Sequence, residues 1–107
     1  MKGHRSSREE KWRTPEEDYI IPLLESLVEL GGRARTKDVL DRVYQKMKDQ
    51  LTEADKEKLP KGQDIRWRNT VQWCRFALVK EGLITPNTPR RTIEITEKGR
   101  EYLKKWL

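Results

Sequence analysis

Cysteine, histidine and phenylalanine are almost missing from this chain, which has one residue of each type. Cys74 cannot form an internal disulfide bond, and its place among regularly spaced apolar residues predicts a small buried side chain rather than a nucleophile. His4 has no cluster of metal-ligating residues around it. The sequence also shows no glycine-rich phosphate loop and no catalytic constellation that includes histidine. We therefore expect no metal, no other cofactor and no enzymatic activity.

Long apolar runs are missing as well. No stretch approaches the roughly 20 apolar residues that a membrane-spanning helix requires. The N-terminal residues are polar and charged, whereas a secretory signal peptide has an apolar centre. Together with the single cysteine, these absences predict a soluble cytoplasmic protein without membrane contacts.

Charge is abundant and unevenly distributed. The 107 residues carry a formal net charge of +6, with 39% charged and 34% hydrophobic residues. A chain of this length supports one small domain with a modest core. Residues 14–30 contain five acidic and no basic residues, whereas lysine and arginine are in excess in most other segments. This asymmetry favours a side that binds a polyanion, although uneven charge also occurs in proteins that bind no nucleic acid.

Residues 65–82 form the clearest predicted helix and carry the most functional side chains. Four apolar residues recur at helical spacing and predict a buried face, namely Trp67, Val71, Cys74 and Leu78. The other face presents amide and cationic groups, which match base edges and phosphates in the major groove of DNA. The candidate DNA-binding residues of this helix are Arg66, Arg68, Asn69, Gln72, Arg75 and Lys80.

The aromatic residues of the chain are expected in different environments. Phe76 lies near the centre of the outward face, where it could pack under the preceding loop, form a partner surface or touch a thymine methyl group. We favour packing under the loop. Trp73 is expected at the edge of the core, against the first helix or the strands. Trp67 and Trp106 are expected to pack in the core or against loops.

The start of the first helix is predicted from a capping pattern. Thr14 supplies an N-cap hydroxyl, Pro15 the first helical position, and Glu17 the acidic partner of a capping box. Pro22 lies inside this helix and should bend it.

Three further helices and a hairpin follow in the predicted order. The second helix begins near Thr36, a short helix lies within residues 51–59, and the last helix follows Thr96. The charge run at residues 55–58 of the short helix is interpreted as solvent-exposed surface.

A β-hairpin is predicted between the third main helix and the last one. Residues 83–85 and 92–95 read as its two strands, joined by a turn with two prolines and one asparagine. The resulting order predicts a mainly α fold with a small β-hairpin, which is a winged helix, a variant of helix-turn-helix. Arg90, Arg91 and Thr92 occupy the place where the wing would meet phosphates.

Residues 1–13 form a basic arm ahead of a predicted winged-helix domain of residues 14–107. The glycine, serine and cationic residues of the arm predict a flexible segment, and frayed termini have a similar composition. On DNA the arm could follow phosphates or enter the minor groove. Its candidate phosphate contacts are Arg5, Arg8, Lys11 and Arg13.

Several short motifs lie in a fairly specific order along most of the chain. They are Tyr19-Ile-Ile-Pro22-Leu-Leu, Gly32-x-Ala34, Leu59-Pro60-Lys61-Gly62, Trp67-x-Asn69-x-x-x-Trp73-x-x-x-x-Leu78-x-x-x-Gly82-Leu83 and Ile95-Thr96-x-x-Gly99. On these motifs, residues 18–106 resemble the N-terminal domain of Mrr-type restriction endonucleases. The resemblance implies a winged helix that binds DNA and, in full-length enzymes, delivers a separate nuclease domain to its target, often modified DNA. That nuclease domain would follow Leu107, so we expect a free-standing, non-catalytic module.

Two classes of function remain open. The first is a module for double-stranded DNA, with the third main helix in the major groove and the wing on the backbone. It would serve as the targeting part of a restriction-type system whose nuclease is on another chain, or as a transcriptional regulator, normally a homodimer. The second is a winged helix that binds other proteins and no DNA, which Phe76 and Val79 on the outward face keep open.

Overall fold

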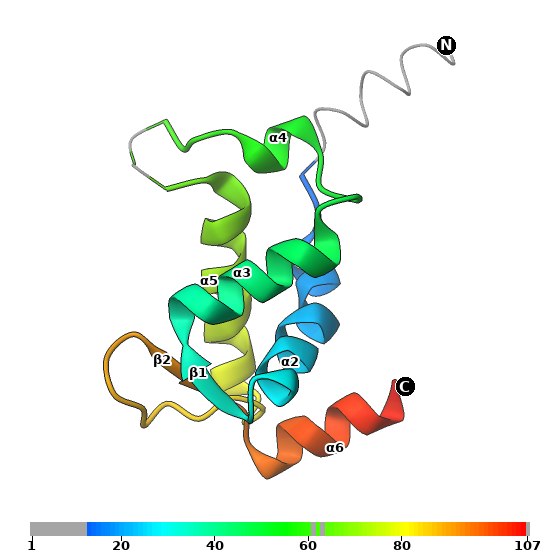
Figure 1. The fold of residues 1–107 in the computed structure, drawn as a ribbon, viewed down its shortest axis with the longest axis vertical. Coiled ribbons are helices and arrows are strands. Elements are labelled where there is room, and N and C mark those ends of the chain that lie inside the picture. Colours follow the sequence, from blue (N-terminus) through cyan, green and yellow to red (C-terminus); the bar gives the residue numbers. More distant parts are fainter. Residues whose placement is uncertain (1–12, 61, 63, 107) are drawn as a thin grey trace.

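The computed structural model describes residues 13–60, 62 and 64–106. In chain order the elements are η1 (Glu16–Tyr19, a 3-10 helix), α2 (Ile20–Glu29), β1 (Arg33–Arg35), α3 (Thr36–Met47), α4 (Glu53–Lys56), α5 (Arg66–Lys80), β2 (Thr92–Glu94) and α6 (Glu97–Lys105). In Figure 1, α3 crosses in front of α5, α4 lies at one end of α5, and the strands lie at the other end. The architecture confirms the mainly α winged-helix fold that the sequence predicts.

The sheet is built differently from a simple hairpin. Strand β2 pairs antiparallel with β1, and Arg35 lies opposite Thr92 in the register. The other predicted hairpin arm, residues 83–85, joins the far edge of β2 through one bridge between Ile84 and Ile95. This arm also donates the Thr85 N–H to the Glu94 carbonyl at 3.0 Å. Strand β2 is therefore the central strand, and it links the wing to the start of α3.

The first helical segment does not begin as its capping pattern predicts. Pro15 occupies the N-cap position without a side-chain hydrogen bond, and η1 precedes α2. Thr14 instead donates its backbone N–H and its hydroxyl to the two carboxylate oxygens of Asp55, at 2.8 and 2.6 Å. Pro22 is the third residue of α2, where a backbone N–H would have no partner within the α-helix. The change from 3-10 to α-helical geometry thus comes before Pro22, at the junction of η1 with α2.

Asp55 connects this first segment to α4. Its carboxylate also accepts the Thr52 N–H at 2.9 Å, while its own N–H donates to the Thr52 hydroxyl at 3.2 Å, so that Thr52 caps α4. Asp55 is only 1% exposed. The prediction of a solvent-exposed charge run is therefore wrong at this residue, because a carboxylate bound by several donors can be buried.

The hydrophobic core lies among α2, α3 and α5 and is closed by the strands and α6. Its fully buried side chains include Tyr19, Leu23, Leu27, Val39, Val43, Val71, Cys74, Ile84 and Ile93. Burial raises the pKa of the Cys74 thiol to about 12, with a further contribution from the charge of Glu16. Trp106 is 64% exposed at the end of α6, so its predicted packing in the core or against loops is wrong.

Candidate nucleic-acid interface

Helix α5 buries the face that its apolar spacing predicts and presents its polar face outward. The buried residues of the helix are Trp67, Val71, Cys74 and Leu78. On the outward side, Asn69 and Gln72 lie one turn apart and are half-buried, whereas Lys80 is exposed in the last turn. Within the described part of the chain, no hydrogen bond engages the Asn69 or Gln72 amide. Both amides are therefore available to a ligand on this face.

Arg66 is directed toward α4 rather than along the outward face. Its Nε donates to the carbonyl of Ala54 at 3.2 Å, and its backbone N–H donates to the carbonyl of Glu57 at 2.8 Å. These bonds anchor the first turn of α5 to the end of α4. Arg66, a candidate DNA-binding residue, therefore has a structural role, because it holds α5 against α4.

A basic hollow lies between the start of α3, the first turn of α5 and the wing. It has a volume of about 650 Å³, and we call it the basic hollow. Its lining consists of Arg35, Thr36, Lys37, Leu40, Arg68, Arg90, Arg91 and Thr92. Five of these side chains are cationic, and they come from three separate segments of the chain.

The pairing of β1 with β2 brings those segments together. Arg35 faces Thr92 across the ladder, and the Thr36 N–H at the start of α3 donates to the Arg91 carbonyl at 2.9 Å. Arg91 itself has a positive φ of 62°, which turns the chain into β2. Because the N-terminus of α3 also lies here, its helix dipole adds positive potential to that of the five cations.

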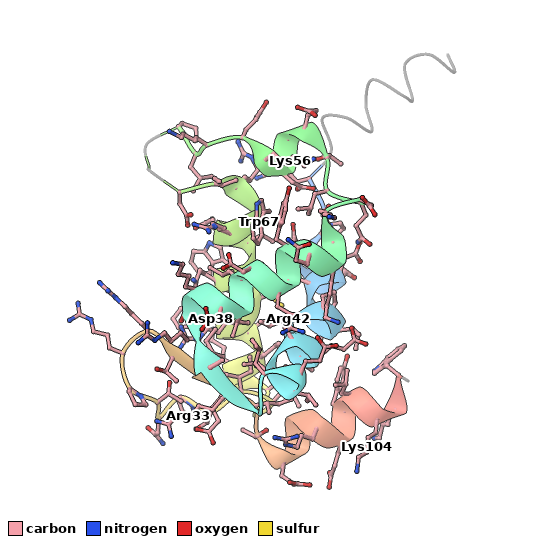
Figure 2. The ribbon with its side chains drawn as sticks, viewed as in Figure 1. Arg33, Asp38, Arg42, Lys56, Trp67 and Lys104 are labelled. Carbon is pink, nitrogen blue, oxygen red and sulfur yellow. The ribbon has the colours of Figure 1, made fainter. Side chains whose placement is uncertain are left out.

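Arg68 forms the α5 wall of the basic hollow. Its guanidinium carbon lies 5.8 Å from the centre of the Trp67 ring, a distance at which a cation–π attraction orients the side chain. Trp67 in turn pairs with Tyr44 of α3, with ring centres 5.5 Å apart, at the α4 end of α5 (Figure 2). The Arg68 Nε is buried without a hydrogen-bond partner among the described residues. An anion in the hollow would supply a hydrogen-bond acceptor for the Arg68 guanidinium group.

The cations of the basic hollow form no ion pair with the described residues of the protein. Among the described residues, the ion pairs join Arg33 to Glu94, Arg42 to Glu29, and Lys46 to Glu25 and Glu29. None of these pairs involves a residue that lines the hollow. The five cations are therefore free to interact with an external anion.

The wing is fastened to α5 by Arg75. This side chain donates from Nη2 to the carbonyl of Thr92 at 3.3 Å, and the Thr88 hydroxyl donates to the same carbonyl at 2.8 Å. Thr92 directs its own hydroxyl to the carbonyl of Arg90 at 3.4 Å. Arg90 and Arg91 remain exposed at the tip. The structure thus brings the predicted wing residues beside Arg68 and Arg75, whereas Lys80, in the last turn of α5, does not line the basic hollow.

A second hollow, of about 440 Å³, follows the outward face of α5 to the first hairpin arm. We call it the aromatic hollow. Its lining consists of Asn69, Gln72, Trp73, Arg75, Phe76, Val79 and Pro86. Trp73 is 56% and Phe76 60% exposed, and their ring centres lie 6.0 Å apart. Arg75 borders this hollow and also contacts Thr92, which lines the basic hollow.

The exposure of these two rings corrects two predictions. Trp73 is not buried at the edge of the core, and Phe76 does not pack under the preceding loop. The reason is that Trp67, Val71, Cys74 and Leu78 already fill the contact of α5 with the core. Trp73 projects beyond this contact, and the connection before α5 is held at the opposite end of the helix by Arg66.

The N-terminal arm is described only at its last residue. Arg5, Arg8 and Lys11, together with Trp12, lie outside the described residues. Arg13 is exposed and directly precedes Thr14, which is fixed by Asp55.

Arg35 and Lys37 are the functional candidates that the sequence interpretation missed. Both are exposed and both line the basic hollow. The signal was present in the short extended segment Arg33–Arg35, which could have been paired with the returning strand of the hairpin. Such a pairing places the start of α3 next to the wing.

The described part of the chain offers neither a metal site nor a membrane-spanning helix. Its described residues contain no group of three or more histidine, cysteine, aspartate or glutamate side chains that could hold a metal ion. No described helix has the length and apolar character needed to cross a membrane.

Comparison with known proteins identifies one relationship. A family model, the Mrr N-terminal domain, matches residues 17–105 and so covers most of the 107-residue chain. No curated protein and no solved structure gave a significant match.

Proposed function

Since the chain belongs to the Mrr N-terminal domain family, we propose that it binds double-stranded DNA without catalysis. In this proposal α5 enters the major groove, and the basic hollow holds the sugar-phosphate backbone beside it. The observation that carries the proposal is the gathering of five cations from three segments beside a helix that presents two amides, with no ion pair or amide hydrogen bond to these groups from the described residues. We further propose that the module serves as the targeting part of a restriction-type system.

The chemistry of the side chains assigns different roles to the guanidinium groups and the amides. Phosphate contacts fix register and orientation, and base contacts in the groove supply specificity. The guanidinium groups of Arg68, Arg90 and Arg91 suit phosphate because they can donate paired hydrogen bonds. Asn69 and Gln72 carry the paired donor and acceptor groups that match a base edge. The two kinds of group lie in adjoining hollows.

Salt dependence tests the phosphate contacts. If each of the five cations neutralises one phosphate, the logarithm of the association constant should fall with the logarithm of salt concentration with a slope of about −4.5. Fluorescence anisotropy of a labelled duplex, measured between about 50 and 200 mM salt, gives this slope. A flat salt response, or no binding at the lowest salt, would refute the proposal.

A matched pair of variants separates the basic hollow from overall charge. Arg90→Glu with Arg91→Glu should weaken binding by more than about tenfold and make the slope shallower by about 2. Lys104→Glu with Lys105→Glu makes the same change of net charge on α6, which lies away from the wing in Figure 2, and should have a much smaller effect. Equal losses in both variants would show that only net charge matters.

The exposed pair Trp73 and Phe76 favours a second candidate, a winged helix that docks another protein. Phe76→Asp should then abolish partner capture, while Arg90→Glu with Arg91→Glu, at residues outside the aromatic hollow, should leave it intact. For a DNA-binding module the arginine changes are the damaging ones.

A further inference from the structure

The centre of the outward face of α5 combines an apolar ring with two amides. Asn69, Gln72 and Phe76 are spaced by three and four residues, which places them on one stripe of the helix. All three line the aromatic hollow, where Trp73 supports the Phe76 ring. A ligand of this stripe must therefore present a hydrogen-bonding edge and an apolar group side by side.

Base edges in the major groove offer this combination at one kind of base pair. Adenine presents the N7 acceptor and the N6 donor, which the amide of asparagine or glutamine can bond in pairs. Its partner thymine presents the C5 methyl group, an apolar feature that phenylalanine can contact. A G·C pair presents neither the adenine pattern nor a methyl group.

We propose that this stripe recognises A·T base pairs, with Asn69 or Gln72 bonding adenine and Phe76 contacting the thymine C5 methyl group. The assignment rests on the proposed DNA binding and adds the residues that determine specificity. Arg75 supports this occupant, because it borders the aromatic hollow and bonds Thr92 in the wall of the basic hollow. A sugar-phosphate backbone held in the basic hollow would thus lie beside this stripe of α5. The edges of its bases would then lie against the stripe.

Uracil provides the sharpest test, since it keeps the hydrogen-bonding groups of thymine and lacks only the methyl group. Anisotropy titrations at about 50 mM salt, where phosphate contacts are strong, would compare an alternating A·T duplex with the same duplex containing uracil. The wild-type protein should bind the thymine duplex about three- to fourfold more tightly for each methyl group that it removes from water. In Phe76→Ala this ratio should fall to one.

Two further duplexes test the adenine contact. An alternating G·C duplex should bind about fivefold more weakly or worse, because the amides lose their paired partner. A G·C duplex with 5-methylcytosine restores the methyl group but not adenine, so it should recover only part of the loss. If methylated G·C bound as tightly as A·T, the adenine assignment would be wrong.

Controls separate recognition from folding. Phe76 is largely exposed, so Phe76→Ala should keep the melting temperature of the wild type. Trp106→Ala removes another exposed aromatic ring, on α6, and should leave the thymine-to-uracil ratio unchanged. Equal wild-type binding of both duplexes, or a ratio that survives in Phe76→Ala, would overturn the inference. Either result, with binding still salt-dependent, would leave the proposed DNA binding intact.

Discussion

Replacing Asp55 by alanine should destabilise the domain more than any surface substitution. The carboxylate is fully buried and accepts the Thr14 N–H at 2.8 Å, the Thr14 hydroxyl at 2.6 Å and the Thr52 N–H at 2.9 Å. Asp55→Ala leaves these donors unpaired, and a buried donor without a partner costs about 1–3 kcal/mol. Water can reach some of them after the change, so we expect a total loss of about 3 kcal/mol.

That loss is a large part of the stability of a small domain, which is about 5–15 kcal/mol. It corresponds to a decrease of about 12–24 °C in melting temperature for a domain of this size. Urea denaturation followed by circular dichroism gives the free energy of unfolding, provided that the m-value stays unchanged. Glu57→Ala, which removes an exposed carboxylate two residues away, should change stability by less than about 0.5 kcal/mol.

Two partial variants test the origin of the effect. Thr14→Val removes one donor and should cost about 1 kcal/mol. In the double variant with Asp55→Ala the two losses should not add, because both act on the same hydrogen bond. If Asp55→Ala lost less than about 1 kcal/mol with an unchanged m-value, the carboxylate would not hold the N-terminal segment to α4 in the way described.

Two other expectations follow from single buried positions. Gly99→Ala should destabilise the protein by about 2 kcal/mol or more in urea denaturation, because an added Cβ would collide with the Leu83 carbonyl and the Ile95 side chain. The Cys74 thiol, whose pKa burial raises to about 12, should resist iodoacetamide in the folded protein and react after unfolding. Because the unfolded thiol ionises first, this residue should also lower stability as the pH rises from 9.0 toward about 12. Rapid alkylation of the folded protein, or a thiol that has no effect on alkaline stability, would contradict the burial of Cys74.

Local periodicity was enough to predict the helix that carries most of the candidate DNA-binding residues. The spacing of Trp67, Val71, Cys74 and Leu78 identified the buried face of α5, and the outward candidates follow directly from it. The winged-helix order and the caps Thr52 and Thr96 were also predictable, because each depends on neighbouring residues.

Contacts between distant segments were not predictable in this way. Thr14 was assigned to cap its own helix, but Asp55 lies 41 residues away and offers a charged acceptor. Similarly, Arg35 and Lys37 join the basic hollow only because β1 pairs with β2. Trp73 is a large apolar residue of the kind that often packs in a core. Its exposure depends on which neighbouring side chains already fill the core.

The same limit applies to the net charge of +6, which describes the whole chain and identifies no surface. The structure divides the cations of α3 into two groups. Arg42 and Lys46 face α2, where Glu29 accepts from both at 3.2 and 2.7 Å. Lys37, at the other end of α3, meets no carboxylate of the described residues and lines the basic hollow. Helix α2 thus neutralises one side of α3, and the positive charge of Lys37 adds to the cations beside the wing. Arg42→Glu should therefore disturb DNA binding far less than Lys37→Glu, although both make the same charge change on one helix.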